Sequence, residues 1–299
     1  MLTAAQGLRV ALRHGGRPPG AGDLRVADGS TVDLPDLPPQ VGLTPEGRPW
    51  RRVWSLADRL VVEYVDVVTV EVRDDGAVVF DEDLPADVEE HLLLDHVLPL
   101  FLARRGAIVL HGAVLRRGDD AVVLCGPTGA GKSTLSAYAT QRGWTLGGDD
   151  GAVLHFDRAV TVEPTYSTVR LTPESVRLLG LPSDLGREVA GKRRLEAGSM
   201  TSLAWEPTRL AMVAHVQPTD EAATFRLLQG AEAHATLFGV TFHADLGPGN
   251  LLRSVVDHLA MLAEQVTVGR LSVPRGQDGL AAAEQVLRQV LASEVANGA

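Results

Sequence analysis

One segment constrains the fold of this chain more than any other: residues 121 to 143, "AVVLCGPTGAGKSTLSAYATQRG". A short, valine-rich apolar run precedes a glycine-rich loop, and a run typical of a helix follows the loop and ends at Gly143. The loop, residues 126 to 133, matches the pattern G-x-x-x-x-G-K-[ST] of a phosphate-binding loop. Because such a loop needs a strand before it and a helix after it, the segment predicts an α/β domain.

The residues of this loop have expected roles toward a nucleotide. Its glycines let successive backbone N–H groups converge on phosphate oxygens at the positive end of the helix. Lys132 is expected to reach the β- and γ-phosphates, and Ser133 to offer its hydroxyl to Mg²⁺. The predicted cofactor contacts are Gly126, Pro127, Thr128, Gly129, Ala130, Gly131, Lys132, Ser133 and Thr134.

The rest of the chain divides near residue 88. Residues 15 to 50 are rich in glycine and proline, which favours irregular backbone. Two β-branched runs follow, residues 59 to 73 and 77 to 83, and an Asp-Asp-Gly turn typical of a hairpin joins them. We therefore expect residues 1 to 87 to form a small, mostly β region that carries no visible chemistry.

Residues 88 to 299 alternate strand-like and helix-like runs, which predicts an α/β domain around a largely buried sheet. The predicted helices are 88 to 106, 132 to 142, 172 to 180, 250 to 266 and 279 to 295. The predicted strands are 107 to 115, 121 to 125, 144 to 146, 152 to 156, 209 to 217 and 224 to 230.

Composition narrows the class of protein. The formal net charge of −10 argues against a general role on nucleic acid, whose phosphates are bound by clustered Lys and Arg. The single cysteine, Cys125, cannot form an internal disulfide, and no Cys/His spacing resembles a zinc site. The apolar stretch 92 to 103 is too short to span a bilayer, and the N-terminus lacks a signal-peptide pattern. We expect a cytoplasmic protein without a nucleic-acid or membrane partner; a homo-oligomer stays open.

Two adjacent aspartates follow the loop. Asp149 comes seventeen residues after Lys132 (149 − 132), and it and Asp150 stand between the strand-like runs 144 to 146 and 152 to 156. Beside a triphosphate, one carboxylate can bind Mg²⁺ while the other takes a proton from an attacking hydroxyl. A surface Asp-Asp-Gly turn is the alternative interpretation.

Motifs of other nucleotide-binding classes are missing from the sequence. An ABC-type ATPase would carry an LSGGQ-like signature and a later strand ending in Asp-Glu, and a GTPase would carry an N-K-x-D-like guanine-binding motif. Their absence, together with the acidic pair, favours phosphoryl transfer from ATP.

His111 is a third candidate. If Gly118 centres the turn after residue 115, residue 116 lies opposite 120 and His111 lies opposite Cys125, because both pairs sum to 236. This register puts His111 beside the mouth of the loop, where it can donate a hydrogen bond to phosphate or tune an aspartate. A histidine that is satisfied at a strand end is the alternative.

Residues 109 to 150, "VLHGAVLRRGDDAVVLCGPTGAGKSTLSAYATQRGWTLGGDD", together resemble the core of the HPr kinase/phosphorylase family and its HPr-kinase-like relatives, which share a fold with phosphoenolpyruvate carboxykinase. In that family a His-Gly pair precedes the P-loop and an Asp-Asp pair follows it. Residues 91 to 106 and 268 to 276 are also similar, so the resemblance covers residues 88 to 294. It implies a P-loop kinase core with a mixed β-sheet flanked by helices, as in the C-terminal domain of HPr kinase.

The resemblance also implies a role for each site residue. Lys132 becomes a phosphate ligand, Ser133 a Mg²⁺ ligand and His111 a helper at the phosphates. Asp149 becomes the base and Asp150 a metal partner. The last two roles could be reversed, because adjacent residues of an extended segment point to opposite sides.

The chain departs from the family at one motif and carries one further basic run. The "IRGLGIID"-like signature, which supplies another acidic metal residue, is missing; "EPTYSTVRLTPESV" stands in its place, with Glu163 as the substitute candidate. Later, Lys192, Arg193 and Arg194 are candidates for gripping a phosphate or an anionic acceptor. A solvated loop is the alternative for this run.

The sequence therefore predicts an ATP- and Mg²⁺-dependent kinase whose acceptor is a hydroxyl of a peptide, a protein or a small molecule. Two alternatives stay open. One is a regulatory module that binds nucleotide without transfer, and the other is a bifunctional kinase/phosphorylase.

Overall fold

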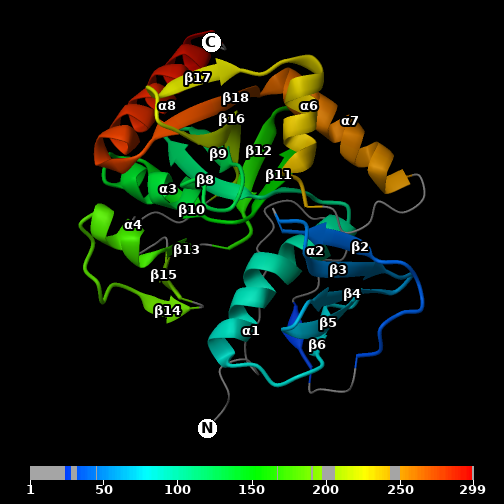
Figure 1. Ribbon diagram of the computed structural model, residues 1–299. Helices are drawn as coiled ribbons and strands as arrows, with labels where there is room; N and C mark the ends of the chain where they lie inside the picture. Colours follow the sequence, from blue (N-terminus) through cyan, green and yellow to red (C-terminus); the bar gives the residue numbers. More distant parts are fainter. Residues whose placement is uncertain are drawn as a thin grey trace. The chain divides into compact units, whose positions relative to one another are not determined.

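The computed structural model describes residues 24–27, 32–44, 46–166, 168–189, 191–196, 206–242 and 250–297. The chain groups into two compact units (Figure 1). The first unit runs to Arg105, and the second runs from Gly106 to Phe242 and continues from Asn250. The boundary expected after residue 87 falls inside helix α1 (Ala86–Leu92), which groups with the first unit.

The first unit contains a sheet with the strand order β1-β6-β5-β4-β3-β2. β1 is parallel to β6, and the other neighbours are antiparallel. The strands are β1 (Arg25–Val26), β2 (Gln40–Leu43), β3 (Pro49–Ser55), β4 (Arg59–Tyr64), β5 (Val68–Arg73) and β6 (Ala77–Phe80).

The expected hairpin between residues 59 and 83 is confirmed, with one addition. β5 and β6 pair antiparallel across a turn in which Gly76 has φ +86°. The run 59 to 73 is two strands, because the chain turns at Asp66, which adopts φ +61°, a region that aspartate tolerates. β1, β2 and the first two residues of β3 lie within the segment 15 to 50 that composition indicated to be irregular, so that expectation was wrong for these residues.

A helical segment closes the first unit and changes its winding along its length. α1 leads into a π-helical stretch, η2 (Leu93–Val97), and then into α2 (Leu98–Arg104). In the π turn the N–H of Leu98 donates to the carbonyl of Leu93. Pro99 follows directly; it lacks an N–H, and its ring excludes the carbonyl four residues earlier, so regular winding is not available here. The expected helix over 88 to 106 is therefore present with a widened turn.

Within the described part of the second unit, a mixed sheet of nine strands forms the centre. Its path runs β10-β8-β9-β16-β12-β11-β7, with β18 on β16 and β17 on β18. β9, β16 and β18 are parallel to one another, whereas β8 is antiparallel to β9. The strands are β7 (Ile108–Leu110), β8 (Gly112–Arg117), β9 (Asp120–Cys125), β10 (Thr145–Gly148), β11 (Ala152–Phe156), β12 (Val160–Pro164), β16 (Thr208–Thr219), β17 (Thr224–Leu227) and β18 (Thr267–Pro274).

Helices cover both faces of this sheet. α3 (Lys132–Thr140) and α8 (Gly276–Asn297) pack on one face, and α6 (Gly230–Gly239) and α7 (Asn250–Gln265) pack on the other (Figure 1). Successive residues of β9 alternate between the two cores: Val122 and Leu124 face α3, and Val123 and Cys125 face the opposite side. The predicted α/β architecture with a mixed sheet flanked by helices is confirmed.

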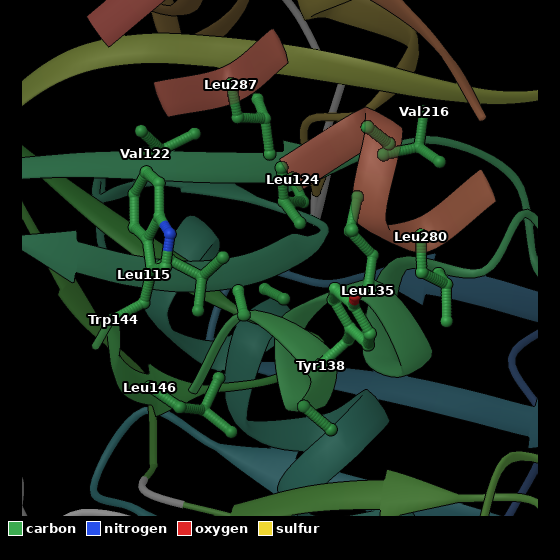
Figure 2. Close-up of a cluster of buried hydrophobic side chains, with 14 of the residues drawn as sticks. Leu115, Val122, Leu124, Leu135, Tyr138, Trp144, Leu146, Val216, Leu280 and Leu287 are labelled. Carbon is green, nitrogen blue, oxygen red and sulfur yellow. The ribbon is translucent and has the colours of Figure 1, made fainter. Parts of the chain in front are cut away.

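The core beneath α3 is rich in large side chains. Figure 2 shows Leu124, Leu135 and Tyr138 in one cluster with Trp144 and Leu287. Burying such side chains contributes about 1.5–3 kcal/mol each. This packing fixes the start of α3 against the sheet and so positions the loop between β9 and α3.

A small third sheet has the order β13-β15-β14. Its strands are β13 (Thr168–Leu171), β14 (Arg187–Val189) and β15 (Lys192–Glu196). α4 (Pro173–Leu178) follows β13, and the Thr172 hydroxyl caps it by accepting from the N–H of Ser175 at 3.1 Å. Among the helices that the structure describes, none is long and apolar enough to cross a membrane.

Candidate functional site

The glycine-rich loop joins β9 to α3, as its pattern requires. Gly126, Gly129 and Gly131 adopt φ values of +134°, +83° and +92°, which residues with a β-carbon rarely reach. At Gly126 a β-carbon would lie 2.7 Å from the carbonyl oxygen of Val216 on β16. The loop therefore needs glycine here both for its backbone angles and for its close approach to the neighbouring strand.

Lys132 is the first residue of α3 and is buried. Its Nζ donates to the carbonyl oxygens of Gly126 at 2.9 Å and Pro127 at 3.3 Å. The ammonium group is thus held against the loop. Of the other predicted cofactor contacts, Thr128 and Gly129 are exposed, whereas Ala130 is buried.

Two residues that follow Lys132 bond to other elements. The Ser133 hydroxyl donates to Oδ2 of Asp149, and the Thr134 hydroxyl lies 2.7 Å from the Ser175 hydroxyl at the start of α4. The hydrogen bond from Ser133 to Asp149 joins the loop to the acidic pair. The sequence predicts only that the loop and the pair lie near each other.

Asp149 is held on several sides just beyond β10. It is 1% exposed, its backbone N–H donates to the carbonyl of Thr168 at 2.9 Å, and its Oδ1 accepts from the N–H of Asp150 at 3.1 Å. Because this carboxylate is nearly inaccessible and bonded to Ser133, it is better suited to coordinate a metal ion than to contact an acceptor hydroxyl.

Asp150 differs from Asp149 in conformation and exposure. It adopts φ +64°, and its side chain is 18% exposed. One carboxylate oxygen lies 3.9 Å from a terminal nitrogen of Arg170 on β13. The two aspartates therefore have different surroundings, which the adjacent letters in the sequence do not reveal.

His111 lies beside the acidic pair, but the register used to place it was wrong by one residue. β8 and β9 pair Arg117 with Asp120 and Gly112 with Cys125, so opposed residues sum to 237. The turn has two residues, Gly118 and Asp119, where one central residue had been assumed. His111 stands between β7 and β8, and its Nδ1 lies 3.3 Å from the backbone oxygen of Asp150.

Glu163, the substitute candidate for a metal ligand, lies on β12. Its Oε1 is 3.1 Å from Nε2 of His155 on the paired strand β11. Within the described ranges, no group of three or more His, Cys, Asp or Glu side chains is arranged to hold a metal ion. Ser133 and Asp149 are a donor set of the kind that Mg²⁺ uses when phosphates and water complete its shell.

The basic run at residues 192 to 194 lies in strand β15. The alternative interpretation of this run from the sequence was a solvated loop. Arg194 is 2% exposed and donates to the Thr168 hydroxyl at 3.2 Å. Arg193 is half-buried and donates to the carbonyl oxygens of Ser183 and Gly186. Arg194 thus bonds to Thr168 of β13, the residue whose carbonyl accepts from the N–H of Asp149. Lys192 pairs with Val189 in the β14–β15 ladder.

Two residues near the site were not singled out from the sequence for chemistry. Arg170 carries no motif, and its approach to Asp150 depends on where β13 lies. His215 lies on β16 opposite Cys125, the residue before the loop. Burial, followed by the charge of Arg270, lowers the pKa of His215. Only the parallel pairing of β16 with β9 reveals this position.

Comparisons with known proteins give a distant structural likeness. No protein-family model and no curated protein matches the chain. The chain is similar to the solved HPr(Ser) kinase/phosphatase from Coxiella burnetii over 64% of this chain and 94% of that chain, with 10% identity and a TM-score of 0.39. Because this likeness is so distant, a function for this chain has to rest on the geometry of its own residues.

Proposed function

We propose that this protein is a kinase that transfers the γ-phosphoryl group of ATP, with Mg²⁺, to a hydroxyl of a peptide, a protein or a small molecule. In this reaction an acceptor oxygen bonds to the γ-phosphorus while the bond from that phosphorus to ADP breaks. The acceptor loses its proton to a protein base.

The hydrogen bond from Ser133 to Asp149 carries the proposal. It brings the first helical turn after the loop into contact with a carboxylate sixteen residues away in sequence. A nucleotide-binding loop needs a hydroxyl for Mg²⁺, and phosphoryl transfer needs carboxylates beside the phosphates. A surface turn, the alternative for the aspartates, does not account for a carboxylate that is 1% exposed and bonded to this serine.

The geometry favours the reverse of the roles that the resemblance implies for the two aspartates. Asp149 shares a hydrogen bond with Ser133, so we assign both to the Mg²⁺ side of the site. Asp150 is more accessible, so we assign it as the base that takes the acceptor proton. His111 would fix the Asp150 backbone through the 3.3 Å contact, and Arg170 would orient its carboxylate.

Lys132 supplies the positive charge for the phosphates. Its Nζ is bonded to loop carbonyls, and a phosphate oxygen would compete for the same ammonium hydrogens. Bound Mg²⁺ would neutralise negative charge on the phosphates. A regulatory module would use the same contacts without an acceptor, and a bifunctional enzyme would also run the reaction backward from inorganic phosphate.

The aspartate variants test the assignment. ATP with Mg²⁺ should raise the melting temperature of the wild-type protein in a concentration-dependent manner. In Asp150→Asn this shift should survive, while transfer of labelled γ-phosphate to a panel of serine peptides and small alcohols falls by roughly 10² to 10⁴. Asp149→Asn should instead raise the Mg²⁺ concentration needed for the shift, and Ser133→Ala should add little to that change because both act on one metal position.

Each alternative predicts a different result. An ATP-dependent shift without transfer to any acceptor would favour the regulatory module, and phosphate-dependent loss of phosphate from the product would favour the bifunctional enzyme. If ATP raised the melting temperature of a folded Lys132→Ala variant as much as that of the wild-type protein, the assignment of the loop as the nucleotide site would be wrong. Phosphoryl transfer at the wild-type rate by both aspartate variants would mean that the acidic pair is only a turn without a catalytic role.

A further inference from the structure

A second group of side chains that can form polar contacts lies in the first unit, whereas the glycine-rich loop belongs to the second unit. This Trp50 cluster consists of Trp50, Arg51, Tyr64, His91, Asp95 and His96. Arg51 on β3 pairs directly with Tyr64 on β4. The kinase proposal uses none of these residues.

The widened helical turn assembles one side of the cluster. Residues five apart in an α-helix point about 140° away from each other. Here the π turn brings the ring centroids of His91 and His96 to 5.2 Å, and His91 Nδ1 lies 2.6 Å from Oδ2 of the buried Asp95. His96 in turn lies 5.5 Å from Tyr64 and 6.0 Å from Trp50, measured between ring centroids. π turns of this kind are frequent at functional sites.

Two donors of the cluster have no hydrogen-bond partner in the part of the chain that the structure describes. Tyr64 is 4% exposed, and its buried hydroxyl is unpartnered. Burial raises the pKa of Tyr64, so this hydroxyl keeps its proton. The buried Nε of Arg51 is also unpartnered, and the guanidinium carbon lies 4.9 Å from the centroid of the Trp50 ring. Burial lowers the pKa of Arg51.

This arrangement is unfavourable without a further group. Arg51 as a whole is half-buried, but its Nε–H and the Tyr64 hydroxyl are buried donors, and a buried donor is destabilising unless it is bonded. The stacking of Arg51 on Trp50 compensates for only part of that cost. Its immediate neighbour Arg52 shows the usual solution, since its terminal nitrogen lies 2.6 Å from Glu63. Buried unsatisfied groups are few in native structures, so each calls for an explanation, and a ligand atom that bonds to them is one.

We propose that the Trp50 cluster binds a carboxylate of a ligand, with Arg51 Nε–H and the Tyr64 hydroxyl donating to its oxygens. The guanidinium edge matches the two oxygens of a planar carboxylate. Arg51 is the one permanent cation of the cluster, and Asp95 already adds a carboxylate, so a monoanion suits the site better than phosphate. Trp50, which is 36% exposed, offers an apolar surface beside it. The ligand class is therefore a carboxylate attached to an apolar group.

The test uses the full-length protein with acetate, phenylacetate and inorganic phosphate as probes, at constant ionic strength with chloride. Each carboxylate should raise the melting temperature with concentration and shift the Nε–Hε resonance of Arg51 in ¹⁵N NMR. Phenylacetate should bind more tightly than acetate, because its ring can contact Trp50. Phosphate should produce a smaller effect than phenylacetate at equal concentration.

Matched variants separate binding from a structural role. Arg51→Gln should weaken phenylacetate binding roughly tenfold or more, since it removes a charge-assisted bond, and Tyr64→Phe should weaken it about fivefold. Arg52→Gln, which removes the neighbouring and already paired arginine, should bind phenylacetate as the wild-type protein does. An Arg51 resonance that no carboxylate moves would overturn the proposal in the wild-type protein, even if a variant failed to fold. Equal binding by Arg51→Gln or a preference for phosphate would also overturn it.

Discussion

At the scale of single residues, His215 shows how position alone changes a side chain's chemistry. Its buried Nδ1 has no hydrogen-bond partner among the described residues, and burial and Arg270 lower its pKa below the ordinary value of 6.5. The unfolded chain therefore binds a proton at a higher pH than the folded protein does. By linkage, this group reduces the free energy of unfolding as the pH falls below about 6.5, until the folded histidine also titrates.

Replacing His215 by Gln removes this titration. We expect the free energy of unfolding of His215→Gln to vary less between pH 7 and pH 5 than that of the wild-type protein, whatever its absolute value. Urea unfolding at several pH values measures both slopes. Identical slopes would mean that protonation of His215 is not coupled to unfolding.

At the scale of elements, one buried network connects α8 to the start of β10. Trp144 Nε1 donates to Glu284 Oε1 at 2.7 Å, and Arg288 donates to the same oxygen at 2.6 Å. Glu284 is 4% exposed, and Trp144 leads into β10, which ends at Gly148, directly before Asp149. The C-terminal helix thereby helps to hold the strand that presents the acidic pair.

Glu284→Ala should lower the free energy of unfolding by about 1–3 kcal/mol, because it leaves the buried Trp144 N–H without an acceptor and removes the partner of Arg288. Urea unfolding measures the change. The exposed Gln285 on the same helix gives the control, since Gln285→Ala should change stability by less than about 0.5 kcal/mol. Equal effects of the two variants would argue against the network.

At the scale of the whole molecule, the division of the chain into two units matters most. The segment that contains α1 and α2 groups with the first unit, and Arg104 at its end bonds to Asp74, Ser55 and the carbonyl of Leu56. A boundary after residue 87 would cut α1 and separate this segment from the sheet to which it is bonded.

Two fragments test this division. A fragment of residues 106 to 299 should fold and keep its stabilisation by ATP and Mg²⁺. A fragment of residues 88 to 299 should be less soluble, because it exposes the buried leucines of the helical segment. Thermal unfolding with and without ATP, together with light scattering, measures both properties. A folded 106-to-299 fragment without any ATP response would show that nucleotide binding needs the first unit.

Features that depend on neighbouring residues could be predicted from the order of amino acids alone. The strand, loop and helix of residues 121 to 143, the turn at Gly76 and the Thr172 cap follow from local patterns, because periodicity and turn chemistry act over a few residues. The mixed α/β class follows from how such elements alternate. The resemblance on which the kinase prediction draws also rests on a continuous stretch of sequence.

Contacts between groups that are distant in sequence became visible only in the folded chain. The β8–β9 register was wrong from sequence by one residue, because the size of the turn sets it. The bond from Ser133 to Asp149, the approach of Arg170 to Asp150 and the place of His215 depend on how separate strands pair. In the same way Arg51 appears in sequence as one more basic residue beside Arg52. The packing of its strand decides that, among the residues that the structure describes, Arg52 has a carboxylate partner and Arg51 has none, because burial and pairing come from residues far apart in the chain.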